Sequence, residues 1–456
     1  MKKCLFLLSA IVACCMMPSC SSASDDEEDK KEIVEEEKKD NTEEVIDDDG
    51  DVEKNDSDDV VYMLPRTTPV VLSAAQKVFA NDNNSFTLSF LKTMNEAVNS
   101  GKGFVCSPLS ITYVLAMVND AASGETEQEL EQTLGFHKGG IQAVNGYCKN
   151  LIDNLPKVDE NVQLTIANAI FLNKIYTLRD QFLKDMKTYY DAKAEALDFS
   201  SPATLGYING WCNEKTQGMI PTILNEVDPD AVSYLLNAIY FKANWMSKFD
   251  PSKTKTETFA TPTGTKQIPL MHQNVMTGYM KTDDYAAVTM PYGSGLWNMT
   301  VLLPEEGKTT DDVISILAKE GWLTDYDKNP LMGYREAEVD LKLPRFETST
   351  DTNDFGSLVG MLKEMGIQQA FNPKKAEILN MCDVPVFISM MRQKAKIEVN
   401  EEGSKMAAVT VAQMDATSMA PDEMVKADFH ANRPFVYLIH EASSGVILFV
   451  GKYTGE

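Results

Sequence analysis

Residues Lys396–Pro421 read KIEVNEEGSKMAAVTVAQMDATSMAP. The stretch begins with apolar Ile397 and Val399 alternating with polar neighbours, a pattern that predicts a β-strand. After Gly403 neither glycine nor proline follows until Pro421, although loops normally contain both. The residues between are mostly small or β-branched, which is typical of strands. The stretch therefore has the composition of a latent strand, of a kind that proteins rarely leave exposed.

The charge of the chain excludes some partners. Its 456 residues carry a net charge of −26, from 42 Lys and Arg against 68 Asp and Glu. Residues 25–60 alone contain 20 acidic and five basic residues. This balance argues against nucleic acid and against an anionic membrane surface, since both require a basic face.

The N-terminus is predicted to be a targeting segment. Residues 1–19 place two lysines before an apolar run, Leu5–Met17, which suits a signal peptide and is too short to span a membrane. The run ends in Met17-Pro18-Ser19-Cys20, which resembles a bacterial lipobox. This resemblance implies an exported lipoprotein whose lipidated Cys20 becomes the mature N-terminus. The alternative is a plain secretory signal cut nearby.

Residues 20–69 are predicted to be an acidic, disordered tether. The segment has few aromatic residues and long acidic blocks, so it lacks the apolar area needed to fold and its charges repel one another. The acidic residues after Cys20 resemble the surface-export signal of some double-membraned bacteria. We therefore expect the protein in the cell envelope, at the outer membrane and facing outward.

Residues 70–456 are predicted to form one large α+β domain, because no linker or repeat divides them. Asn84 or Ser85 is expected to cap an early helix, Ser107-Pro108 to open a second, and Gly135 to end a third. Strand-like runs dominate from Tyr234 onward.

Motifs for catalysis or metal binding are absent from the sequence. Gly-x-Ser-x-Gly does not occur, and the cysteines show no Cys-x-x-Cys spacing. The four histidines form no His-x-x-x-His pair and are predicted to be surface or core residues: His137, His272, His430 and His440. We therefore predict no enzyme, no cofactor and no metal site.

Several blocks in the folded region match the pattern of a known protein family. The blocks are Phe104–Ile111, Asn237–Trp245 with Phe249–Pro251 and Thr254, Met290–Tyr292 with Met299–Pro304, Leu343–Phe346, Glu398–Ser404 and Ala431–Phe435. Together they span roughly Ser73 to Tyr453 and resemble, in the same order, the serpin family of protease inhibitors.

The resemblance implies a serpin-like fold, with helices packed on a large mixed sheet A, two further sheets and an exposed reactive loop at about residues 403–428. It also implies a suicide-substrate mechanism. A protease cuts the loop and forms an acyl-enzyme, and the cut loop then enters the central sheet before the ester is hydrolysed. A non-inhibitory serpin fold that is merely a protease substrate is the alternative.

The resemblance further assigns roles to single residues. Counting from the hinge places the cleaved bond at Thr417-Ser418, with Met414, Ala416 and Met419 left open as recognition residues. These neighbours imply elastase-like, subtilisin-like or papain-like target proteases, and we expect the protein to be a monomer. The hinge comprises Glu401, Glu402, Gly403, Ser404, Met406, Ala407, Ala408 and Thr410, where Met406 departs from the family's preference for alanine.

Two clusters are implied to control opening of the sheet. The first comprises Ser107, Ser110, Asn237 and Gln393, where Gln393 stands in place of the family's histidine. The second lies at the top of the gap and comprises Trp245, Arg345 and Glu401.

Overall fold

The computed structural model describes residues 67–98, 101–137, 139–320, 335–404 and 425–456. The helices are α1 (Ala74–Ala97), α2 (Pro108–Ala121), α3 (Gly124–Leu134), α4 (Gly140–Asn154), α5 (Asp180–Tyr190), α6 (Ala203–Lys215), α7 (Thr310–Glu320) and α8 (Leu358–Glu364). Short 3₁₀ helices are η1 (Leu155–Lys157), η2 (Pro251–Lys253), η4 (Thr352–Phe355) and η5 (Gln369–Phe371).

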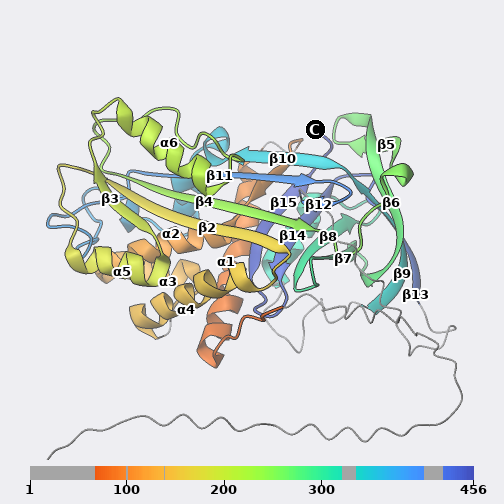
Figure 1. Cartoon of the computed structure of the whole chain (residues 1–456), viewed down its shortest axis with the longest axis horizontal. Coiled ribbons are helices and arrows are strands. Elements are labelled where there is room, and N and C mark those ends of the chain that lie inside the picture. The colour runs from red at the N-terminus through yellow and green to blue at the C-terminus, as the bar shows by residue number, and fades with distance from the viewer. Residues whose placement is uncertain (1–66, 99–100, 138, 321–334, 405–424) are drawn as a thin grey trace, which may run out of the picture. The chain divides into compact units, whose positions relative to one another are not determined.

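The strands form two sheets (Figure 1). They are β1 (Phe104–Cys106), β2 (Val162–Asn173), β3 (Lys193–Leu197), β4 (Ser233–Asn244), β5 (Lys255–Thr261), β6 (Gly264–Lys281), β7 (Tyr285–Tyr292), β8 (Trp297–Pro304), β9 (Arg335–Pro344), β10 (Phe346–Asp351), β11 (Met390–Val399), β12 (Gly403–Ser404), β13 (Val425–His430), β14 (Phe435–Glu441) and β15 (Ile447–Tyr453).

The six-stranded sheet has the order β10-β11-β4-β2-β3, and β12 pairs with β4. Successive side chains of β4 point to opposite faces of the sheet, and each face packs against a hydrophobic core. Leu235 belongs to the main hydrophobic core, whereas Leu236 belongs to a second core that includes Trp211 of α6. Helix α2 contacts β4 as well. The sheet is therefore a central layer with helices on both faces (Figure 1).

The nine-stranded sheet has the order β1-β15-β14-β8-β7-β6-β9-β13, with β5 paired to β6. Strand β6 is 18 residues long and joins two parts. Its first half pairs with β5, its middle with β9, and its last residues with β7. The two smaller sheets expected from the sequence are thus connected through one strand.

The helix starts follow local capping rules, with one correction to the sequence analysis. The predicted cap at Asn84 or Ser85 is wrong, because α1 already begins at Ala74. There Ser73 and Gln76 form a capping box. Asn84 is instead buried inside α1, where its amide donates to the carbonyl of Gly445 at 2.8 Å.

The other two boundaries are confirmed. Pro108 occupies the first turn of α2, and Gly135 ends α3 in the left-handed conformation at φ 80°. Among the described helices none is both long and apolar enough to cross a membrane.

Candidate functional site

The ladder between β11 and β4 stops partway along both strands. It joins Met390–Gln393 to Tyr234–Asn237 in parallel. From Lys394 to Val399, β11 pairs on its other side with β10. Within the described residues no ladder pair joins this upper part of β11 to β4. Strands β11 and β4 of the central sheet are therefore paired with each other at one end only (Figure 1).

A tight turn brings the chain back between these strands. The N–H of Asn400 donates to the carbonyl of Gly403 at 3.0 Å, and the N–H of Gly403 donates back at 3.2 Å. Strand β12 then pairs antiparallel with β4, Gly403 opposite Asn244 and Ser404 opposite Ala243. Gly403 and Ser404 of the hinge thus already occupy a strand position beside β4.

Gly403 cannot be replaced by a residue with a side chain without strain. Its φ of +126° disfavours L-residues. A Cβ atom there would lie 2.4 Å from the carbonyl oxygen of Ala243 and 2.6 Å from the nitrogen of Trp245. The close approach of the β4 backbone therefore explains why a glycine occupies this position of the hinge.

Trp245 holds the turn in place. Its ring is 2% exposed and stacks on Tyr292 with ring centroids 4.2 Å apart. The indole N–H donates to the carbonyl of Asn400 at 2.9 Å, and the backbone N–H donates to that of Glu402 at 2.9 Å. Trp245 directly follows β4, so these hydrogen bonds attach the turn to β4, the strand with which β12 then pairs.

Glu401 is bound by polar partners on two sides. Its carboxylate accepts from both Nε and a terminal nitrogen of Arg345, and from the hydroxyl of Thr254 at 2.7 Å. Burial opposes ionisation of this carboxylate. The hydrogen bonds from Arg345 and Thr254 outweigh that effect and lower the pKa of Glu401 below its ordinary value. The structure therefore places Trp245, Arg345 and Glu401 at the same end of the opening.

The other predicted cluster meets only in part. The side-chain amide of Gln393 accepts from the backbone N–H of Ser107 at 3.0 Å and donates to its carbonyl at 2.8 Å. Ser110 donates to the Ser107 hydroxyl at 2.9 Å. Asn237 pairs with Gln393 in the ladder, but its side chain donates to Asn168 of β2 at 2.7 Å. The cluster thus connects α2 to β11, and β4 to β2.

The remaining predicted residues lie outside the described part of the chain. This applies to the bond Thr417-Ser418, to Met414, Ala416 and Met419, to Met406, Ala407, Ala408 and Thr410 of the hinge, and to Cys20. Sequence reasoning missed Asn168, Asn400 and Tyr292 as partners of the site. Asn400, Tyr292 and Thr254 each carried a signal, since each belongs to one of the matching blocks, whereas Asn168 carried none.

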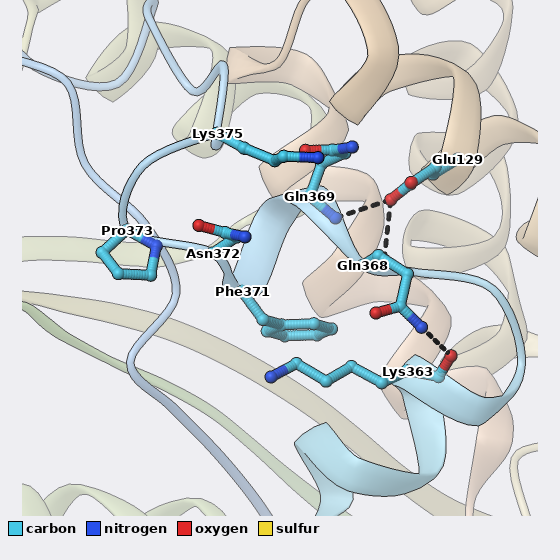
Figure 2. A pocket seen from close by; sticks show the side chains of 8 residues that line it. All are labelled: Glu129, Lys363, Gln368, Gln369, Phe371, Asn372, Pro373 and Lys375. Carbon is cyan, nitrogen blue, oxygen red and sulfur yellow. Dashed lines mark hydrogen bonds between the residues drawn. The ribbon is translucent and has the colours of Figure 1, made fainter.

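A separate hollow of about 480 Å³ lies between α3 and α8. Figure 2 shows the carboxylate of Glu129 directed at the backbone nitrogens of Gln368 and Gln369, at 2.7 Å each. Glu129 thus already occupies the position that an anionic ligand would take. We assign no function to this hollow.

The fold is α+β, and in its central sheet β11 and β4 pair with each other at one end only, while β12 enters between them at the other end. These features together define a structural class. The profile of that class, described as Serpin (serine protease inhibitor), matches residues 81–455. The chain belongs to the serpin family.

Similar sequences and a similar solved structure support the same conclusion. The chain is 32% identical to an uncharacterised serpin-like protein of Thermococcus kodakarensis, covering 85% of this chain and 88% of that one. It is 30% identical to the leukocyte elastase inhibitor of Homo sapiens, covering 82% and 98%. The structure is similar to the native state of the thermophilic serpin tengpin, with a TM-score of 0.72, 26% identity and coverage of 85% and 96%.

A further neighbour is human thyroxine-binding globulin in complex with its ligand, at a TM-score of 0.73, 27% identity and coverage of 84% and 100%. The predicted fold class is therefore confirmed. The similar proteins thus include a thyroxine-binding globulin as well as an elastase inhibitor.

Proposed function

We propose that this serpin is a suicide-substrate inhibitor of serine proteases, and of papain-like cysteine proteases as a second target class. The observation that carries the proposal is the position of β12. Gly403 and Ser404 already pair with the upper end of β4, where the described part of β11 makes no ladder with β4. A cut loop would continue this ladder toward Asn237.

Insertion has a physical driving force in this sheet. Strands β11 and β4 run parallel, whereas β12 runs antiparallel to β4. A strand continuing from β12 would thus replace a parallel contact with two antiparallel ladders, which are slightly more stable per residue. Fourteen inserted residues, at about 3.3 Å each, would carry an attached protease on the order of 45 Å.

The bond Thr417-Ser418 is proposed as the cleavage site, with Met414, Ala416 and Met419 as the alternatives. Small and medium apolar residues surround it, and these suit the recognition pockets of elastase-like and subtilisin-like enzymes. Mass spectrometry of the released C-terminal peptide tests the assignment. A peptide that begins at any residue other than Ser418 would refute it.

The test of inhibition is a denaturing gel of the protein mixed with elastase-like, subtilisin-like and papain-like proteases. We expect a band at the summed mass of protein and protease that survives detergent, because the acyl-enzyme ester is covalent. Cleaved protein without such a band, across the whole panel, would favour the non-inhibitory alternative.

We further propose that residues 1–19 are removed, that Cys20 is lipidated, and that residues 20–69 tether the inhibitor domain to the outer face of the cell envelope. The Met17-Pro18-Ser19-Cys20 motif supports this proposal. Cys20→Ala should release the protein from the membrane fraction. An unchanged distribution between membrane and medium would contradict it.

A further inference from the structure

Three neighbouring strands present a polar cluster on one face of the nine-stranded sheet. Asp428 of β13 lies directly opposite Asp340 of β9 in a parallel ladder. His430 follows two residues after Asp428 and therefore points to the same face. Carboxylates placed directly opposite each other repel and destabilise a sheet. A bound cation would remove that repulsion.

The distances bring these side chains within reach of a single ion. One ligand atom from each of Asp340, Asp428 and His430 lies within 4.8 Å of the others. The ligands of a tetrahedral zinc ion lie roughly 3.3 Å apart. Asp340 and His430 already have this spacing, at 3.3 Å, and small side-chain rotations at the sheet surface would bring Asp428 to the same spacing.

A second histidine orients one of the carboxylates. His272 of β6 places Nε2 2.5 Å from one oxygen of Asp340, while Nε2 of His430 lies 3.3 Å from the other. In metal sites a ligating carboxylate is itself commonly held by a hydrogen bond from an outer residue. His272 stands in that outer position.

The lysines around the cluster are paired with other carboxylates. Asp340 and Asp428 line an open hollow of about 300 Å³ together with Lys426. Lys426 pairs with Glu338 at 2.9 Å, and Lys342, between the two histidines in the ladder, pairs with Glu257 at 2.9 Å. Each nearby ammonium group therefore already has another carboxylate partner.

We propose that Asp340, Asp428 and His430 bind one divalent transition-metal ion of the zinc type, with water completing its coordination and His272 orienting Asp340. One imidazole and two carboxylates form a ligand set that zinc accepts. An imidazole ligand favours zinc over calcium and magnesium, which prefer oxygen ligands alone.

Such an ion would fasten β13 to β9. Strand β13 is the last strand in the order of its sheet and pairs along six residues with β9. It also directly follows residues 405–424, which contain the proposed cleavage bond. The ion would thus strengthen the attachment on the C-terminal side of the reactive loop. This consequence rests on the proposed function, whereas ion binding itself does not.

The test is calorimetric titration of the chelator-treated whole chain with zinc chloride, in excess magnesium so that carboxylate-only sites are filled. We expect one equivalent to bind with micromolar or tighter affinity and to raise the melting temperature by mass action. Asp428→Asn and His430→Gln should each weaken binding at least about tenfold. The control is His137→Gln, an exposed histidine elsewhere in the fold, and it should bind as the parent does.

The metal-free melting temperatures of the variants show whether each folds. No saturable zinc binding would overturn the proposal, as would equal affinity in the parent, Asp428→Asn and His430→Gln. Cobalt titration followed by visible absorption provides a second measurement, because a cobalt–imidazole signal should be lost in His430→Gln. Failure of protease inhibition would leave these results unaffected, so the two proposals can be told apart.

Discussion

Glu401 is the residue at which the stability of the hinge depends on pH. Its pKa is lowered by hydrogen bonds from Arg345 and Thr254, which outweigh the opposing effect of burial. A lowered pKa stabilises the folded state above the unfolded-state pKa of about 4.3, and this contribution is lost as the pH falls through the folded value. Glu401→Gln should therefore lower the free energy of unfolding by about 1 kcal/mol at neutral pH, a figure reduced because Arg345 is half exposed.

The same substitution should have little effect once the carboxylate is protonated in the parent, well below pH 4.3 or so. Urea unfolding of both proteins at the two pH values measures the difference. Glu402→Gln is the matched control, because Glu402 pairs with Lys248 at the surface and should change stability by less than about 0.5 kcal/mol. An equal loss for Glu401→Gln at both pH values would rule out the assigned ion pair.

At the scale of the element, β12 sets the register for any strand that follows it. Gly403 pairs with Asn244 and Ser404 with Ala243. Continued antiparallel pairing would bring Ala408 opposite Ile239 and Ala407 opposite Tyr240. Ile239 belongs to the main core, so Ala408 would enter that core.

Ala408→Arg should therefore abolish trapping. An arginine at this position would have to bury an unpaired charge, which costs several kcal/mol and slows insertion relative to hydrolysis. We expect cleaved protein and no detergent-stable complex. Ala407→Arg would lie on the opposite face beside Tyr240, which belongs to neither hydrophobic core, so its long side chain can extend to solvent and the complex should still form. Equal behaviour of the two variants in the gel assay would show that the inserted register is wrong.

The elements also show what could be predicted from the sequence. Pro108 and Gly135 mark helix ends through their own backbone restrictions, so local rules suffice for them. The cap at Ser73 was missed because Asn84 is an equally good capping residue in isolation, and only tertiary contacts bury it. The Asn237–Asn168 bond joins two strands, and the cluster of Asp340, Asp428 and His430 spans two as well. Motif searches along one chain segment do not detect such pairs.

For the whole molecule, the proposed insertion of the cut loop into the half-paired central sheet would make the cleaved chain more stable than the intact fold. Cleavage within residues 405–424 would free a strand to enter between β11 and β4. Roughly a dozen new backbone hydrogen bonds, each worth about 1 kcal/mol net, would raise the stability by on the order of 10 kcal/mol. At about 2 °C per kcal/mol for a large domain, the melting temperature should rise by roughly 20 °C.

Calorimetry of intact and loop-cleaved protein, with the cut located by mass spectrometry, measures this shift. The Ala408→Arg variant cleaved at the same bond is the control, because its strand is predicted not to insert and its melting temperature should rise far less. An unchanged melting temperature of the cleaved parent would mean that the opening between β11 and β4 does not accept the loop. Kinetic trapping of the intact state, and with it the inhibitory mechanism, would then be excluded for this protein.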